Sequence, residues 1–473
     1  MINKEQIAQL GLIVGPVLFA ITLYSPIDDI SFEAKVVLGS AIWMGVWWVT
    51  EAIPIYVTAL LPLAIFPSLN VAQLGETSML YADRIVFLFL GGFMLAMAIE
   101  KAGLHKRFAL NVLKVFGTNP KHIVGAFMVV TGSLSAWMSN TATTMLMLPI
   151  AAAVIAQVHS PEERGRFGTC LMLCVAYSAS LGGMATLIGT PPNAIFASLS
   201  KKLINVDVSF GQWMLIGIPV SAISLVVAWW YMVNLGAKIG STPITEEKGI
   251  VIKKLIELGN MTRDEKMVAG VFVATATAWI TRGLIWKDFL PFVDDSTIAV
   301  IAAICLFLIP SVSRGRLLDW ESVVRIPWGV LLLIGGGLAL ASGFTITGLD
   351  VWIADQLKFL GGMHYFLIIL IIVAVIIFAG EILSNTATAA LFIPIVASLA
   401  VSLEISPLLL MLPITLATAF GFIMPVGTPP NAIVFASGHV TAGKMAKAGF
   451  PLDIIGIVLV SVLATLLVPL VWG

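Results

Sequence analysis

Two short polar strings each occur twice in the chain, in the same order. Ser-Asn-Thr-Ala-Thr occupies residues 139–143 and recurs at 384–388, and Gly-Thr-Pro-Pro-Asn-Ala-Ile occupies residues 189–195 and recurs at 427–433. Their hydroxyl and amide groups offer donors that can hold a carboxylate and oxygens that can help coordinate a hard cation. Because the spacing between the copies is nearly constant, we predict that one half of the chain repeats the other.

The Ser-Asn-Thr strings interrupt two long apolar stretches. A helix that breaks inside a membrane leaves N–H and C=O groups unpaired, and its N-terminus favours anions while free carbonyls favour cations. Interrupted hydrophobic segments at matching places in two halves indicate the binding site of a secondary transporter. The plainer interpretation is that these residues only cap broken helices, but two matched copies favour a binding role.

The Gly-Thr-Pro-Pro-Asn strings indicate a second kind of helix break. Two successive prolines remove two backbone donors and stop a helix, and the glycine permits close approach of a ligand to the backbone. A simple kink would need only one proline, without identical flanking residues in both copies. We therefore expect the two strings to leave a threonine hydroxyl and nearby backbone groups available at membrane depth.

Composition places the chain in a lipid bilayer. Hydrophobic residues make up 59% of it and charged residues only 11%, whereas soluble domains carry about 25% charged residues. The mean hydropathy is +1.02. The net charge is zero, which predicts no basic surface for nucleic acid. The three cysteines lie in apolar runs without the spacing of a metal site or a disulfide framework.

Apolar runs of bilayer-spanning length predict an all-α polytopic membrane protein. Two further stretches, 123–157 and 362–402, are polar at their centres and predict re-entrant helical hairpins, because non-helical backbone at that depth must be buried in protein or line a cavity. We expect eleven full spans, with cores at 8–24, 36–50, 54–69, 85–100, 168–200, 212–236, 266–284, 296–311, 327–345, 407–436 and 449–472.

The distribution of basic residues predicts the orientation of these spans. With the N-terminus in the cytoplasm, 19 of the 26 lysines and arginines fall on cytoplasmic segments, as the positive-inside rule requires. The C-terminus then lies outside, the first hairpin on the cytoplasmic side and the second on the outer side. The two repeats therefore have inverted topology, and we expect the protein to reside in the plasma (inner) membrane.

The paired tips and paired breaks resemble those of the divalent anion:sodium symporter (DASS) family, the INDY-type carboxylate transporters, over nearly the whole chain. The resemblance implies an elevator-type secondary transporter of C4–C5 dicarboxylates such as succinate, malate or 2-oxoglutarate, and a homodimer. It also implies substrate contacts from both repeats: Ser139, Asn140, Thr141, Thr190 and Pro191, with Ser384, Asn385, Thr386, Thr428 and Pro429.

The resemblance further implies a division of the chain into scaffold and transport parts. Residues 1–120 form the N-terminal scaffold helices, and 121–236 form the first half of the transport domain with the cytoplasmic-side hairpin. Residues 237–265 form a polar cytoplasmic linker. The second scaffold part is 266–361, and 362–473 form the second half of the transport domain with the outer hairpin.

Sodium is the one coupling ion that the resemblance implies, and no other cofactor is expected. The candidate sodium-site residues are Ser135, Ser139, Asn140, Gly189, Asn385 and Gly427. The second tip departs from the sodium-coupled pattern, because Gly380 offers no side-chain oxygen and Leu383 is bulky. The main interpretation is therefore sodium-independent dicarboxylate exchange; the alternative is sodium-coupled symport. Glu381, the carboxylate closest in sequence to a tip, is expected either to contact a ligand or to cap the hairpin.

Other function classes find little support. The five histidines fall in connecting segments or at span ends, and neither a His-Glu-x-x-His string nor a phosphate-binding Walker string is present. An enzyme or an ATP-driven pump is therefore not expected. An anion channel is a remaining alternative, because inverted repeats and re-entrant segments also occur in channels.

Overall fold

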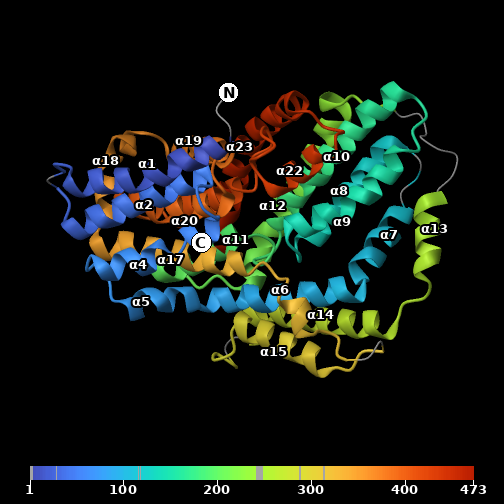
Figure 1. Ribbon diagram of the computed structural model, residues 1–473, viewed down its shortest axis with the longest axis horizontal. Coiled ribbons are helices and arrows are strands. Elements are labelled where there is room, and N and C mark those ends of the chain that lie inside the picture. The colour runs from blue at the N-terminus through green and yellow to red at the C-terminus, as the bar shows by residue number, and fades with distance from the viewer. Residues whose placement is uncertain are drawn as a thin grey trace.

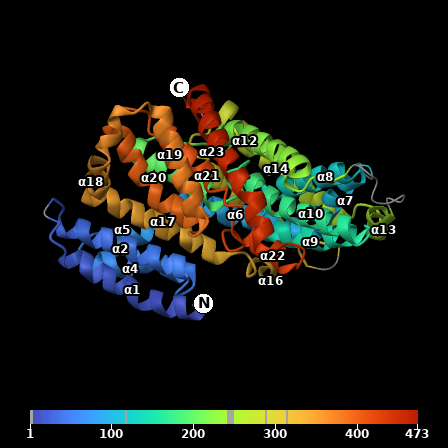
Figure 2. The ribbon, with the colours of Figure 1, turned by 90° about the horizontal axis from the view of Figure 1, so that it is seen from above.

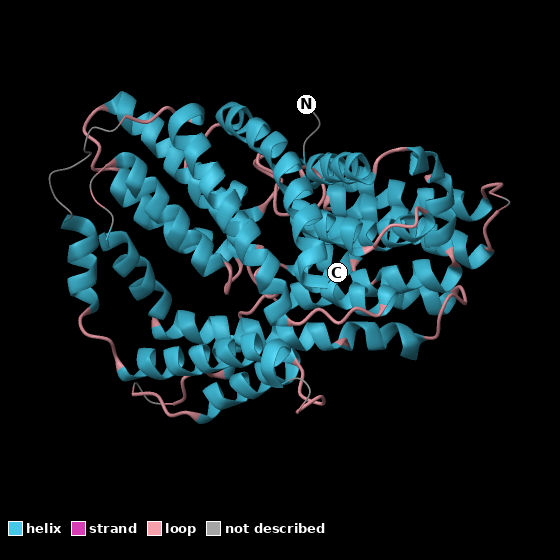
Figure 3. Cartoon of the chain, turned by 180° about the vertical axis from the view of Figure 1, so that it is seen from behind, coloured by secondary structure: helices cyan, strands magenta, loops and turns pink. Residues whose placement is uncertain are grey.

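The computed structural model describes residues 4–27, 29–115, 117, 119–240, 249–286, 289–312 and 315–472. Across these ranges the chain forms helices joined by loops and turns, with no strand (Figure 3). The all-α fold predicted from the sequence is therefore confirmed. Residues 241–248 of the predicted linker lie outside the described residues.

The first repeat contains both predicted interruptions. Its hairpin consists of α8 (Pro120–Ser135) and α9 (Asn140–Ile155), which pack against each other. Its broken helix consists of α10 (Pro161–Gly183) and α11 (Pro191–Ile204). Helix α11 begins at the paired prolines because the first helical turn has no intrahelical use for their missing N–H groups.

The second repeat reproduces this arrangement. Its hairpin consists of α19 (Tyr365–Gly380) and α20 (Asn385–Ser402), and its broken helix of α21 (Leu408–Ala417) and α22 (Pro429–Ala436). Each Ser-Asn-Thr string starts the second arm of a hairpin, and each Pro-Pro pair starts the second half of a broken helix. The predicted positions of all four interruptions are confirmed.

The remaining helices surround these elements. They are α1 (Lys4–Tyr24), α2 (Phe32–Thr50), α3 (Ile55–Thr58), α4 (Leu61–Ser68), α5 (Leu74–Met79), η1 (Leu80–Ala82), α6 (Arg84–Ala102), α7 (Leu104–Val115), α12 (Phe210–Tyr231), η2 (Met232–Gly236), α13 (Gly249–Leu258), α14 (Arg263–Thr281), η3 (Arg282–Trp286), α15 (Asp295–Leu308), α16 (Trp320–Val323), α17 (Trp328–Thr347), α18 (Leu349–Gln356), η4 (Lys358–Gly362) and α23 (Ala442–Trp472). Helices α1, α2 and α4 lie together at one end of the molecule, and α7 and α13 at the other (Figures 1 and 2).

Seven helical segments of the described chain are long and apolar enough to cross a membrane: 5–24, 32–50, 74–102, 210–236, 328–347, 385–402 and 442–472. Six of them coincide with predicted spans, and the seventh is the hairpin arm α20. The count of eleven full spans therefore stays a prediction, whereas a polytopic membrane protein fits these segments.

Several predicted spans are not single helices. The stretch 54–69 forms two short helices, α3 and α4, and Pro62 in the first turn of α4 explains why one helix cannot run through. The stretches 168–200 and 407–436 are each divided at a break. The stretch 266–284 ends in the π-helical turn η3, and the helix within 296–311 ends at Leu308.

The two repeats are interleaved. Helix α9 of the first hairpin packs on α22 of the second broken helix, and α20 of the second hairpin packs on α11 of the first. Helix α10 also contacts α22, and both views place these segments together (Figures 1 and 2). This crossing places helices from the two repeats, far apart in the sequence, side by side.

Candidate functional site

The tip of each hairpin is built in the same way. Ser139 precedes α9 in an extended conformation, and its Oγ accepts a hydrogen bond from the backbone N–H of Ala142 at 3.2 Å. Ser384 precedes α20 and accepts from Ala387 at the same distance. The capping role that the sequence left open therefore holds for both serine oxygens. It leaves the neighbouring asparagine and threonine side chains for other partners.

Asn140 lies where the first tip meets the first break. The Ser135 hydroxyl donates to Asn140 Oδ1 at 2.7 Å. A Cβ atom placed on Gly183 would lie 2.9 Å from that Oδ1 and 3.3 Å from the Gly189 carbonyl oxygen. Hydroxyl, amide and carbonyl oxygens thus gather around one glycine, and such oxygens are the ligands that hard cations prefer. The predicted residues Ser135, Asn140 and Gly189 are brought together here.

The asparagine of each Gly-Thr-Pro-Pro-Asn string forms hydrogen bonds across its helix break. Asn193 Nδ2 donates to the carbonyl oxygens of Gly183 at 3.0 Å and Thr186 at 2.8 Å. Asn431 Nδ2 donates to Gly421 at 2.9 Å and Met424 at 3.1 Å. Both asparagines are fully buried, and the Oδ1 of each has no hydrogen-bond partner among the described residues.

These two asparagines had no assigned role in the sequence interpretation. The signal was available, because Asn closes the repeated string in both copies. Each one donates to the carbonyls seven and ten residues before it in the chain, so each fixes the shape of the interruption. The free Oδ1 atoms add buried oxygens without partners close to the breaks, which is costly unless a ligand or water meets them.

Each tip is tied to its own break, but by different chemistry. In the first repeat, the Thr186 hydroxyl donates to the Ala136 carbonyl. In the second repeat, the buried Glu381 carboxylate accepts backbone N–H groups from Ile423 at 2.9 Å and Met424 at 2.8 Å. Glu381 therefore connects the end of α19 to the turn between α21 and α22, and its predicted contact with a ligand stays a prediction.

The second break also gathers oxygens around a glycine. A Cβ atom placed on Gly427 would lie 3.1 Å from Glu381 Oε2, 3.4 Å from the Met424 carbonyl oxygen and 3.5 Å from the Gly421 carbonyl oxygen. The oxygen donors that Gly380 and Leu383 cannot supply are thus present on other residues. A hard cation fits the chemistry of this donor set as well as that of the first.

The asparagine of the second tip has a different environment from that of the first. Gly380 occupies the position equivalent to Ser135, so no hydroxyl is available to Asn385. The Oδ1 atom of Asn385 is buried and has no partner within the described chain. Leu383, two residues before Asn385, is half-buried.

The other predicted substrate residues lie at the starts of the same helices. Thr190 and Thr428 are buried, have extended backbones, and directly precede α11 and α22. Pro191 is half-buried and Pro429 is exposed. Thr141 is half-buried and Thr386 is buried. The hydrogen bonds of each tip join it to its own break, whereas the two repeats meet through helix packing and through hydrogen bonds such as that from the Tyr177 hydroxyl to the Phe422 carbonyl.

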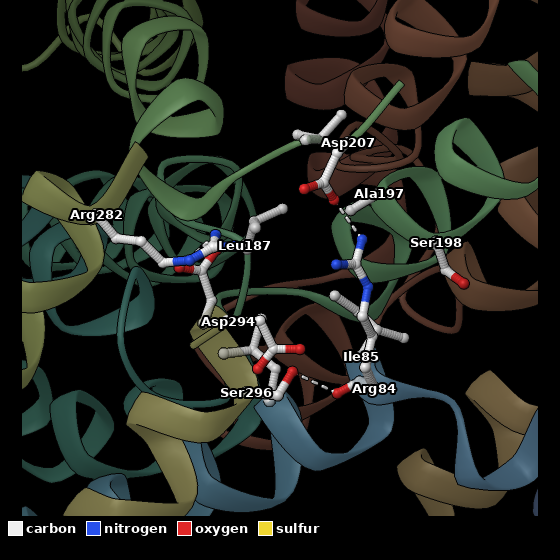
Figure 4. A pocket seen from close by; sticks show the side chains of 12 residues that line it. Arg84, Ile85, Leu187, Ala197, Ser198, Asp207, Arg282, Asp294 and Ser296 are labelled. Atoms are coloured by element: carbon white, nitrogen blue, oxygen red, sulfur yellow. Dashed lines mark hydrogen bonds and ion pairs between the residues drawn. The ribbon is translucent and has the colours of Figure 1, made fainter. Parts of the chain in front are cut away.

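A charged pocket lies apart from the tips, between the start of α6 and the connection from α11 to α12 (Figure 4). Arg84 forms an ion pair with Asp207, and Lys202 pairs with Asp83 at 3.2 Å. The Ser296 hydroxyl donates to the Arg84 carbonyl at 2.6 Å. Sequence reasoning missed this group, because the ion pairs join residues about 120 positions apart.

Comparison with known proteins identifies the family. Residues 5–472 match the family described as the sodium:sulfate symporter transmembrane region. The chain belongs to this family, the DASS family. The predicted resemblance is thereby confirmed.

Two relatives share the same name. The chain is 41% identical over 477 residues to a "Sodium-dependent dicarboxylate transporter SdcS" of Staphylococcus saprophyticus, covering 98% of this chain and 92% of the relative. It is 39% identical over 478 residues to the transporter of that name from Staphylococcus aureus, with the same coverage. These relatives are transporters and not enzymes, so the DASS chain is assigned to membrane transport, as predicted.

A solved structure supports the fold. The crystal structure of the Alcanivorax borkumensis YdaH transporter covers 98% of this chain, and 97% of its own chain is matched, with a TM-score of 0.61 and 14% sequence identity. At that identity the likeness concerns the fold alone. It agrees with the all-helical architecture of this DASS protein.

Proposed function

We propose that this protein is a sodium-coupled symporter of C4–C5 dicarboxylates that works by an elevator-type alternating-access mechanism. The observation that carries the proposal is the doubled construction in which a hairpin tip and a helix break of each repeat enclose a group of oxygens. The first group lies around Gly183 and the second around Gly427. The names of the two relatives, which describe sodium-dependent dicarboxylate transport, support both the cargo and the ion.

Sodium coupling replaces exchange as the main interpretation. The exchange interpretation depended on Gly380 and Leu383, which supply no side-chain oxygen. The Glu381 carboxylate and the carbonyls of Gly421 and Met424 bring oxygens to the same repeat from neighbouring positions. Together with the sodium-dependent relatives, this favours the symporter that was the alternative.

The substrate would be held by neutral groups. The tips contain no lysine or arginine, so the carboxylates of the dicarboxylate would be bound by the Asn and Thr side chains of the tips and by the N-termini of α9 and α20. Helix N-termini favour anions by roughly 0.3–1 kcal/mol each. Two bound sodium ions would offset the charge of a divalent anion, so the loaded carrier would cross the membrane field without a large net negative charge.

We further propose the division into scaffold and transport domains, the homodimer, the cytoplasmic N-terminus and the outer C-terminus that the sequence suggested. The charged pocket supports the division. Arg84 of α6, in the proposed scaffold, pairs with Asp207 of the connection from α11 to α12, in the proposed transport domain (Figure 4), and Lys202 of α11 pairs with Asp83, which directly precedes α6. An elevator movement would have to separate these pairs.

Transport by purified protein in proteoliposomes tests the proposal. Succinate uptake into empty vesicles should require an inward sodium gradient and should depend steeply on sodium concentration. Uptake that needs internal dicarboxylate but not sodium would restore the exchanger. Sodium-independent flux without acceleration by counter-substrate would indicate an anion channel.

A further inference from the structure

Asp453 is a buried carboxylate in the long apolar helix α23. Its side chain is 0% exposed. Asp453 Oδ1 accepts the backbone N–H of Gly421 and Oδ2 accepts that of Phe422, both at 3.3 Å. An acidic residue at membrane depth is expensive to bury and generally has a function. Neither repeated string contains it, and no role has been assigned to it so far.

Asp453 and Glu381 together bind four consecutive N–H groups. Asp453 takes those of Gly421 and Phe422, and Glu381 takes those of Ile423 and Met424. Gly421 has φ of +135°, a backbone conformation that other residues rarely adopt. The turn 421–424 is therefore held by two carboxylates that face each other.

The carbonyl groups of the same turn border the proposed second cation site. The carbonyl oxygens of Gly421 and Met424 lie beside Gly427 and accept from Asn431 Nδ2. The Phe422 carbonyl of the same turn accepts a hydrogen bond from the Tyr177 hydroxyl of α10 at 3.1 Å. Any displacement of the turn would therefore move the oxygens that surround Gly427.

The first repeat holds its equivalent turn without charge. The Trp213 indole of α12 donates to the Met184 carbonyl at 2.9 Å, and the Thr186 hydroxyl donates to Ala136. Helix α12 contains no aspartate or glutamate. A pair of carboxyl groups at this turn is thus a property of the second repeat alone, where the tip lacks the serine hydroxyl of the first.

Within the described residues, no lysine or arginine forms an ion pair with either carboxylate. Two buried carboxylates that face each other are not both ionised, so what this pair provides to the turn is its four hydrogen bonds. We infer that Asp453 is a positioning residue for the second sodium site, where it fixes the turn 421–424 and, with it, the carbonyl oxygens that lie beside Gly427. This inference rests on the sodium coupling proposed above.

The test compares Asp453→Asn with wild type in purified protein. The first readout is the rise of the thermal midpoint with sodium concentration, without substrate and with choline as the replacement cation. We expect Asp453→Asn to need a sodium concentration at least tenfold higher than wild type to reach half of its maximal stabilisation. Its unfolding midpoint without sodium should remain close to that of wild type. Asp350→Asn is the matched control, because Asp350 is a buried carboxylate on α18 that accepts bonds from Ser398 and the backbone of Val351.

Uptake supplies the second readout. In proteoliposomes, Asp453→Asn should raise the half-saturating sodium concentration about tenfold and leave the maximal rate within about twofold. Equal sodium dependence of Asp453→Asn and wild type would overturn the inference and leave symport intact. A wild-type protein without any sodium response would instead overturn the proposed function.

Tyr177→Phe decides the question if Asp453→Asn fails to fold. It removes only the hydroxyl that donates to Phe422 and changes no charge. We expect a two- to fivefold rise in the half-stabilising sodium concentration, since the turn loses one of its anchors. An unchanged sodium dependence in Tyr177→Phe would then overturn the positioning role of this network.

Discussion

The Ser135 hydroxyl donates to Asn140 Oδ1 at 2.7 Å, and this bond has no counterpart in the second repeat. Gly380 stands at the equivalent position, and Asn385 Oδ1 is buried without a partner in the described chain. The two tips therefore share a capping serine but differ in how they orient the asparagine. This difference gives the first prediction.

Gly380→Ser should improve the second tip. A Cβ atom at Gly380 would meet only the Phe420 carbonyl oxygen, at an ordinary 3.8 Å, so the serine fits without displacing its neighbours. Its hydroxyl can donate to Asn385, and a hydrogen bond contributes roughly 0.5–1.5 kcal/mol. We expect a two- to tenfold lower half-saturating sodium concentration in proteoliposome uptake.

Ser135→Ala is the reciprocal variant at the first tip. It leaves Asn140 Oδ1 without its donor and should raise the half-saturating sodium concentration by a similar factor. Opposite shifts in the two variants would support equivalent roles for the tips. A loss of transport in Gly380→Ser would show that the second tip cannot accept the geometry of the first.

Asn140→Ala and Asn385→Ala should each abolish most uptake while expression and folding remain intact. No charged side chain in the tips can compensate for the lost amide. A hydrogen bond to a charged group contributes roughly 1.5–3 kcal/mol, or about ten- to a hundredfold in affinity. Concentration-dependent succinate uptake measures the effect, and size-exclusion chromatography checks folding. Near-normal uptake in both variants would remove the tips from the substrate site.

The ion pair between Arg84 and Asp207 should influence the balance between the two transport states. An exposed or half-exposed pair contributes at most about 1 kcal/mol, so Arg84→Asp should shift the balance by about fivefold or less. The shift is measured as the labelling rate of Ala142→Cys by a polar thiol reagent, in a background without native cysteines. The double variant Arg84→Asp, Asp207→Arg should restore the original rate.

The matched control for that pair is Lys101→Ala. Lys101 pairs with Asp319 at 2.6 Å, and both residues belong to the proposed scaffold. Their separation is unaffected by an elevator movement, so the labelling rate should not change. Equal effects of Arg84→Asp and Lys101→Ala would argue against a state-dependent role for the charged pocket.

Glu265 should make the start of α14 sensitive to acid. Burial opposes its ionisation, but hydrogen bonds from Arg107, at 2.7 and 3.0 Å, and from Thr262 lower the pKa of Glu265 below the ordinary 4.5. A carboxylate with a lowered pKa in the folded state stabilises it above the ordinary pKa, and this stabilisation is lost as pH falls towards the folded-state value. The thermal unfolding midpoint of wild type should therefore decrease as the pH is lowered below about 4.5.

Glu265→Gln isolates this effect. The variant should melt several degrees lower than wild type at pH 7, because Arg107 keeps only its bonds to the carbonyls of Leu258, Gly259 and Asn260. The difference between the two midpoints should narrow as the pH falls below 4.5. A constant difference across that range would contradict the assignment of the pH effect to Glu265.

Features that are local in sequence could be predicted. The hairpin tips and helix breaks follow from serine caps and proline pairs, whose effects act within one helical turn. Uniform hydropathy predicts one span over the stretch 54–69, whereas the structure divides that stretch at Pro62 in the first turn of α4. Hydropathy reports burial in the membrane but not where a helix stops.

Features that depend on long-range packing could not be predicted. Asp453 reaches Phe422 across 31 residues from a different helix, and no spacing rule connects them. The same holds for Tyr177, which bonds to Phe422 from the other repeat. The departure at Gly380 was visible in the sequence, but the replacement oxygens of Glu381 and the turn 421–424 required the folded arrangement.

The interleaving of the repeats has a consequence for biogenesis. Helices α9 and α11 leave the ribosome early, yet the helices on which they pack, α22 and α20, are synthesised more than 180 residues later. The first repeat is therefore inserted with two of its surfaces uncovered, and it cannot reach its final packing until most of the chain has been translated. Its polar tip meanwhile depends on transient cover from lipid headgroups, from the insertion machinery or from a chaperone.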